Sequence, residues 1–146
     1  MKASIGGIFN LFLLTVFIIV ISSLLLFNVS YAKSFRVKDK IITTYEQYEG
    51  VCGPNTSCQA EIRSYEQRLG YRVTNDMHAD AAKQETCYQD LGYCEIRQIA
   101  ANTKPGQRAY TYKIRTEVLV RFPLVDEILG LGKFKISGTT KAIVVN

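Results

Sequence analysis

The stretch that decides the fold is IGGIFNLFLLTVFIIVISSLLLF, residues 5–27, which carries no charged side chain over 23 residues. At ~1.5 Å per residue a helix of this length measures about 34 Å, and the hydrocarbon core of a bilayer is roughly 30 Å thick. A helix also satisfies its own backbone hydrogen bonds, as a segment surrounded by lipid must. We therefore expect a transmembrane helix over residues 5–27, preceded by a short cytoplasmic piece, residues 1–4.

A cleaved signal peptide is the alternative interpretation of this segment. Ser30-Tyr31-Ala32 places small residues three and one before a cut in front of Lys33. The apolar core of a signal peptide is usually only about 7–15 residues long, however, and this run is much longer. We favour a retained anchor; cleavage after Ala32 would instead give a soluble secreted protein.

The helical pattern continues beyond the apolar run. Val37, Ile41, Tyr45 and Tyr48 recur at intervals of three and four residues, with charged residues between them. Residues 28–49 are therefore predicted to continue the anchor as an amphipathic helix that ends near Gly50. Two helices with a bend near residues 28–30 are the alternative.

The next segments are a second helix and a polar excursion. The helix is expected to begin at Ser57 or Cys58 and to run through Leu69, with Gly70 as its stop signal. Residues 71–74 fit a short strand. Residues 75–90 are polar with little periodicity, so we expect an exposed excursion with a turn or short helix.

Strand patterns dominate the rest of the chain. Residues 92–100 predict a strand, and residues 110–122 alternate between apolar and polar side chains over their whole length. An apolar loop or a single helical turn is expected at 124–132. A last strand is expected at 133–144, with Phe134, Ile136, Thr140, Ala142 and Val144 on one face. The even-numbered face would pack on the helix.

These elements define an α+β fold. We expect a long N-terminal transmembrane-plus-amphipathic helix packed on a small antiparallel sheet of three or four strands, with residues 28–146 as the head. A length of 119 residues is enough for one modest core.

Four cysteines form two close pairs, Cys52 with Cys58 and Cys87 with Cys94, and each pair brackets turn-forming residues. Three connectivities are possible, of which we favour the two local ones. Two disulfides indicate an oxidising compartment and hence an extracytoplasmic head. Four free thiols in a cytoplasmic head are the alternative, and the basic residues at 33–40 lean weakly toward it.

Charge is unevenly distributed along the chain. The net charge is +5, but Lys2 and residues 33–40 hold five of the 18 basic groups and one of the 13 acidic groups. Residues 41–146 are therefore close to neutral, which gives no argument for binding nucleic acid. The outer face of the last two strands would still gather six basic side chains against one Glu117. They are Lys113, Arg115, Arg121, Lys133, Lys135 and Lys141. Such a face could bind a partner, which would be DNA, an anionic wall polymer or an acidic neighbouring subunit. An ordinary solvated sheet face is the other interpretation.

No constellation of catalytic residues is visible. The single histidine, His78, lies in a polar stretch, and the cysteine spacings do not suit zinc. We expect no enzyme activity, no cofactor, no metal and no small-molecule substrate.

The plan of the chain resembles type IV pilin-like proteins, most of all the small minor pilins of tight-adherence loci. The features that carry the resemblance are the short basic amino terminus, the membrane helix running into an amphipathic helix, and the antiparallel sheet with a disulfide. Gly7 followed by Ile8 matches the position of the pilin processing site. Phe12 stands where the family has the Glu that is associated with subunit registration.

This resemblance implies a structural or minor subunit of a bacterial envelope filament, or of a secretion or adhesion assembly. Its partners would be membrane lipid and other pilin-like subunits or assembly proteins. The alternative is a permanently tethered single-pass protein whose head is a binding module in an envelope complex.

Overall fold

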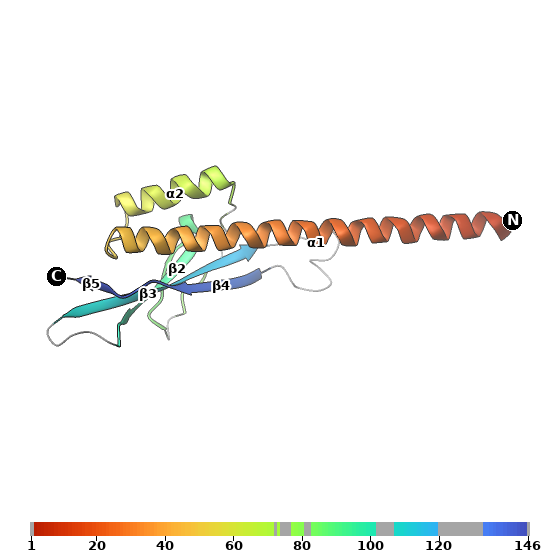
Figure 1. Ribbon diagram of the computed structural model, residues 1–146. Coiled ribbons are helices and arrows are strands. Elements are labelled where there is room, and N and C mark those ends of the chain that lie inside the picture. The colour runs from red at the N-terminus through yellow and green to blue at the C-terminus, as the bar shows by residue number, and fades with distance from the viewer. Residues whose placement is uncertain are drawn as a thin grey trace.

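The computed structural model describes residues 2–71, 73, 77–80, 83–101, 107–119 and 133–145. It is an α+β structure in which one long helix, α1 (Lys2–Gln47), projects far beyond a compact head (Figure 1). The predicted continuity is confirmed: anchor and amphipathic segment form a single helix of 46 residues without a break at 28–30.

Helix α2 (Ser57–Leu69) lies against the second half of α1, and its ends follow the sequence signals (Figure 1). The Thr56 side chain accepts a hydrogen bond from the backbone N–H of Gln59, which satisfies an otherwise unpaired donor of the first turn. Gly70 ends the helix in the left-handed conformation at φ 62°.

The sheet of the described residues has five antiparallel strands. They are β1 (Thr86–Tyr88), β2 (Tyr93–Ile99), β3 (Arg108–Leu119), β4 (Lys133–Thr139) and β5 (Ile143–Val145), with the one-turn 3₁₀ helix η2 (Gln89–Leu91) between β1 and β2. The order is β1-β2-β3-β4, and the long β3 pairs with β4 along one half and with β5 along the other. The predicted α+β fold with a small antiparallel sheet is confirmed: four strands form the main order, and the three-residue β5 pairs with β3 beside it.

The core lies between the inner face of the sheet and the second half of α1. Val37, Ile41 and Tyr45 are completely buried, as the helical spacing predicts. Tyr112 and Ile114 of β3 meet them from the even-numbered face of the sheet. Burial of this apolar stripe is the main force that holds helix and sheet together.

The predicted alternation of the last strand is correct for its first part and wrong for its second. Phe134 and Ile136 face the helix, but Ala142 and Val144 are exposed and Ile143 is buried instead. Thr139 pairs with Lys113, whereas Ile143 pairs with Tyr110, so three residues oppose two between these pairs. This extra residue is a β-bulge, and it reverses the side-chain alternation.

Two further expectations need correction. Tyr71 and Val73 do not form a strand, and the excursion over residues 75–90 is not wholly exposed. Met77 is 1% exposed, and the Glu85 side chain is almost fully covered. The predicted apolar loop at 124–132 lies outside the described residues.

Candidate interaction surfaces

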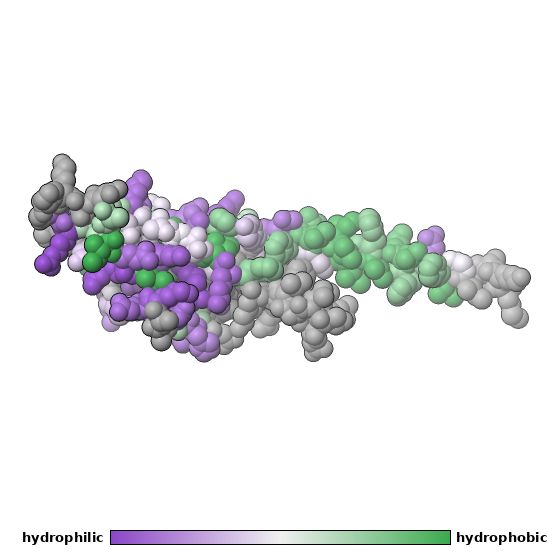
Figure 2. Space-filling view, turned by 90° about the horizontal axis from the view of Figure 1, so that it is seen from below, coloured by the Kyte–Doolittle hydropathy of each residue, from purple (hydrophilic) through white to green (hydrophobic). Residues whose placement is uncertain are grey.

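The first half of α1 presents a bare apolar surface. Every Leu, Ile, Val and Phe between Ile8 and Leu26 is 41–70% exposed. Figure 2 shows this surface as a continuous hydrophobic band that leads away from the head. The helix is long and apolar enough to cross a membrane.

Two polar side chains in this half, Thr15 and Ser23, bond to the backbone of the helix itself. The Thr15 hydroxyl donates to the Leu11 carbonyl at 2.7 Å, and the Ser23 hydroxyl donates to the Ile19 carbonyl at 2.8 Å. Such bonds to the preceding turn remove the need for water. At these two positions the helix therefore suits an apolar environment.

The predicted processing residues, Gly7 and Ile8, lie near the start of α1. A Cβ on Gly7 would meet nothing within 4 Å, and Ile8 is 69% exposed. No contact with the described part of the head covers this peptide bond. A processing enzyme would meet it as an exposed helical segment.

The outer face of the sheet is less basic than the sequence suggests. The Arg115 guanidinium binds Glu85 through Nε and Nη2, and it binds Glu117 through Nη1 at 3.2 Å. Its side chain is only 16% exposed. Arg115 is therefore engaged inside the head, and two carboxylates oppose it in place of the one that was expected.

Of the other members of the predicted basic face, the structure brings Lys113 and Lys135 together with Arg115. Lys113 and Lys135 are exposed beside Arg115 and line a shallow cavity of about 340 Å³ with His78 and Asp80. Lys141 is separated from them because the bulge places its backbone N–H on Glu46 of α1, at 2.9 Å. Lys133 is the first residue of β4. Arg121 lies outside the described residues.

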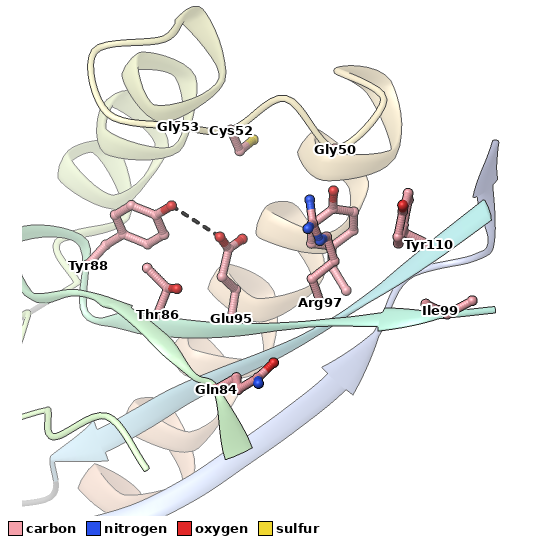
Figure 3. A pocket seen from close by; sticks show the side chains of 11 residues that line it. Gly50, Cys52, Gly53, Gln84, Thr86, Tyr88, Glu95, Arg97, Ile99 and Tyr110 are labelled. Carbon is pink, nitrogen blue, oxygen red and sulfur yellow. Dashed lines mark hydrogen bonds between the residues drawn. The ribbon is translucent and has the colours of Figure 1, made fainter. Parts of the chain in front are cut away.

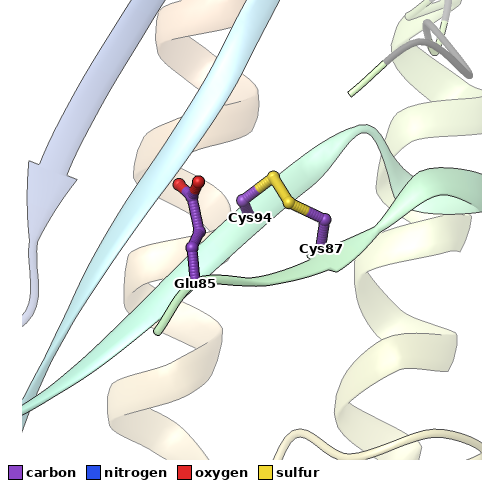
Figure 4. Close-up of side chains that lie close together, drawn as sticks. All are labelled: Glu85, Cys87 and Cys94. Carbon is purple, nitrogen blue, oxygen red and sulfur yellow. A yellow bond between two sulfur atoms is a disulfide. The ribbon is translucent and has the colours of Figure 1, made fainter. Parts of the chain in front are cut away.

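Both disulfides have the local pairing that we favoured, Cys52 with Cys58 and Cys87 with Cys94. Glu85 lies beside the second one (Figure 4), and the three potential ligand atoms of Glu85, Cys87 and Cys94 are within 4.8 Å of one another. Both sulfurs are committed to the disulfide, however, and both Glu85 oxygens accept from Arg115. The group is thus a poor metal ligand set in this state.

A cleft of about 640 Å³, the distal cleft, lies at the end of the head that is remote from the bare helix. Figure 3 shows side chains that line it. One wall is the turn Gly50–Gly53 that follows α1, and the other is the inner face of β1, β2 and β3. Each disulfide supports a wall. Cys52–Cys58 ties the turn to α2, and Cys87–Cys94 ties β1 to β2.

The cleft combines one carboxyl group (Glu95), one guanidinium group (Arg97) and several tyrosine rings. Tyr88 donates a hydrogen bond to Oε1 of Glu95 at 3.1 Å, while Oε2 is buried without a hydrogen-bond partner among the described residues. Burial raises the pKa of Glu95, and the Tyr45 and Tyr88 hydroxyls partly oppose this. The Arg97 guanidinium lies 4.9 Å from the centre of the Tyr110 ring.

Sequence reasoning missed this cleft, although a signal was present. Glu95 and Arg97 are two residues apart on β2 and therefore share its inner face with Tyr93. Two opposite charges on the apolar face of a strand indicate either a buried ion pair or a binding site for a ligand.

The fold and these surfaces define a class: an α+β head on a helix whose free half is apolar and long enough to span a membrane. Comparison with protein-family models, with curated proteins and with solved structures gives no match for this chain.

Proposed function

We propose that this chain is a membrane-anchored, pilin-like structural subunit of an envelope filament or of a secretion or adhesion assembly. One observation carries the proposal: a single helix has a bare apolar first half and a second half that is built into the head. The apolar half has no tertiary partner among the described residues. It needs lipid, or the same helix of other copies, to leave water.

A continuous helix suits exchange between these two environments. The Lys2–Gln47 helix has no break between its bare half and its packed half, so the head moves with the apolar rod as one body. In the membrane the rod would contact lipid chains; in an assembly it would contact neighbouring rods. The partners of the chain would thus be lipid, other pilin-like subunits and the assembly proteins.

The proposed location of the head is outside the cytoplasm. Both cysteine pairs are disulfides, and such bonds persist in oxidising compartments. The intact mass of the protein from native membranes, measured without reductant, tests this. We expect a mass four hydrogens below the reduced value, and a chain beginning at Ile8 if Gly7–Ile8 is the processing site. Four free thiols would place the head in the cytoplasm.

The anchor is tested with a matched pair of lysine substitutions. Ile18 lies in the middle of the bare half, and Ile99 is an exposed isoleucine in the head. Ile18→Lys should weaken retention in carbonate-washed membranes and abolish crosslinked oligomers, because a lysine at the bilayer centre costs about 3 kcal/mol. Ile99→Lys should do neither. Normal retention and assembly of Ile18→Lys would reject the proposal.

The distal cleft favours a second candidate function, a permanently tethered binding module. Glu95 and Arg97 would hold the ammonium and carboxylate groups of a small zwitterion between tyrosine rings. Titration of the full chain in detergent with glycylglycine, followed by nuclear magnetic resonance, tests this. Saturable shifts that Arg97→Gln abolishes, in a chain that forms no oligomers, would favour the module over the filament subunit.

A further inference from the structure

An aromatic column marks the place where the bare helix meets the head. Phe27, Tyr31 and Phe35 follow one another at four-residue spacing on one face of α1. The ring centres of Phe27 and Tyr31 are 5.9 Å apart, and those of Tyr31 and Phe35 are 4.8 Å apart. Tyr31 is nevertheless 42% exposed, so the column is open to its surroundings.

The sheet joins this column at its first ring. Phe134, near the start of β4, packs edge-on against Phe27 with ring centres 5.5 Å apart, and the buried Ile136 contacts the same cluster. Phe27 is also the last residue of the apolar stretch 5–27, and five uncharged residues, 28–32, separate it from Lys33. The head therefore begins where the apolar run ends, and no linker separates them (Figure 1).

The lengths place this contact at a membrane surface. The apolar stretch 5–27 measures about 34 Å as a helix, slightly more than a hydrocarbon core of roughly 30 Å, which puts Phe27 at the edge of that core. Tyr31 lies about 6 Å further along the axis, within the headgroup zone, where tyrosine is enriched. Since Phe134 is level with Phe27, the β4 end of the sheet has the same depth.

The charges beside the column are complementary to acidic lipid. Lys38 pairs with Asp39 and covers the Phe35 ring, and Lys40 pairs with Glu61. Lys33 and Arg36 form no ion pair with the described residues. Arg36 is exposed about 13 Å beyond Phe27 along the axis, from where its long side chain can reach lipid headgroups. The half-buried Lys33, about 9 Å beyond Phe27, has its ammonium near Gly70 at the end of α2.

We propose that the aromatic junction, formed by Phe27, Tyr31, Phe35 and Phe134, is a second membrane-contact site that seats the head on the surface of an acidic bilayer. The site holds the β4 end of the sheet in the headgroup zone and turns the distal cleft away from the membrane. This inference rests on the proposed membrane anchorage, and it adds that the head itself contacts lipid.

Tryptophan fluorescence tests the proposal cleanly because the chain has no native tryptophan. The full chain is reconstituted into vesicles of phosphatidylcholine and phosphatidylglycerol, three to one, that contain lipids brominated at shallow or deep positions. Phe134→Trp is the reporter at the junction. Ile99→Trp marks the far end of the sheet, and Phe17→Trp marks the middle of the bare helix.

We expect shallow bromines to quench Phe134→Trp at least twofold more than deep ones, and neither to quench Ile99→Trp. Quenching of Phe134→Trp no greater than that of Ile99→Trp, with Phe17→Trp still quenched by deep bromines, would overturn the head contact alone. Loss of Phe17→Trp quenching would overturn the anchorage as well. Tyr31→Trp, at an exposed position, repeats the test if Phe134→Trp does not fold.

The preference for acidic lipid is tested separately. Shallow quenching of Phe134→Trp should fall in pure phosphatidylcholine, and Arg36→Glu should remove the difference between the two vesicle types. Equal quenching in both vesicle types for the parent reporter would overturn the role of this cation.

Discussion

Glu85 receives two hydrogen bonds from the Arg115 guanidinium, one from Nε and one from Nη2, and both nitrogen–oxygen distances are 2.7 Å. The Glu85 side chain is 2% exposed, so this pair lies inside the head although both residues come from polar stretches. Arg115 also donates to the His78 carbonyl at 3.0 Å. One arginine therefore fastens the segment before β1 to the outer face of the sheet.

Removal of Arg115 should be costly. Arg115→Leu leaves two covered carboxylates, Glu85 and Glu117, without their cation, and a broken buried pair typically costs about 3–5 kcal/mol. We expect a loss of about 3 kcal/mol in the free energy of unfolding, measured by urea denaturation of the full chain in detergent. Lys83→Gln, on the same segment but in an exposed pair with Asp80, is the control and should leave the midpoint unchanged. Equal midpoints for both variants would contradict the role of Arg115 as the buried partner of these two carboxylates.

Glu66 of α2 should make the stability of the head depend on pH. The residue is 4% exposed, its Oε1 has no hydrogen-bond partner among the described residues, and burial raises its pKa to about 8 despite the opposing charge of Arg63. The folded state thus holds a proton that the unfolded state releases near pH 4.5. Its contribution to stability is full below that pH and is lost as the pH rises through about 8.

Glu66→Gln should remove this part of the pH dependence. We expect the variant to match the parent near pH 5 and to exceed it in stability at pH 9, by a few kcal/mol at most. Urea midpoints at the two pH values measure the difference. Part of the pH dependence of stability should remain in Glu66→Gln, since burial also raises the pKa of Glu95. The exposed Glu49→Gln is the control; a gain at pH 9 for both variants would point to net charge instead.

Gly50 should be intolerant of any side chain. Its φ is +78°, and a Cβ there would lie 2.7 Å from the Tyr112 ring. Gly50→Ala combines a left-handed backbone with a clash against a core aromatic, which should cost about 2 kcal/mol. Gly53, three residues on in the same turn, has nothing within 4 Å of a Cβ. Gly53→Ala should therefore leave urea unfolding unchanged, and similar losses for the two variants would refute this explanation.

The long helix, the end of α2, the local disulfides and the best strand could be predicted because each depends on neighbouring residues. Apolar periodicity, a terminal glycine and short cysteine spacings are local signals. The engagement of Arg115 could not be predicted in this way, because its partner Glu85 is 30 residues away. The distal cleft likewise needs the turn at Gly50–Gly53 to come over β2, a contact that no local pattern encodes.

The most instructive error concerns the bulge after β4, where period-two alternation placed Val144 inside and the structure buries Ile143. Thr140 fixes this bulge. Its backbone N–H donates to the Tyr112 carbonyl at 2.9 Å, and its hydroxyl oxygen accepts from the Tyr112 N–H, also at 2.9 Å. A side-chain acceptor thereby replaces the ladder bond that regular pairing would have supplied.

Thr140→Val tests that role because it keeps the shape of the side chain and removes only the acceptor. The Tyr112 N–H would then be buried without a partner, at a cost of about 1–3 kcal/mol. We expect a lower urea midpoint together with faster hydrogen exchange at the Tyr112 amide, measured in the full chain. Thr139→Val, one residue earlier and exposed, should change neither quantity. Unchanged Tyr112 exchange in Thr140→Val would mean that the bulge is held by backbone pairing alone, and the reversal of alternation would then need another cause.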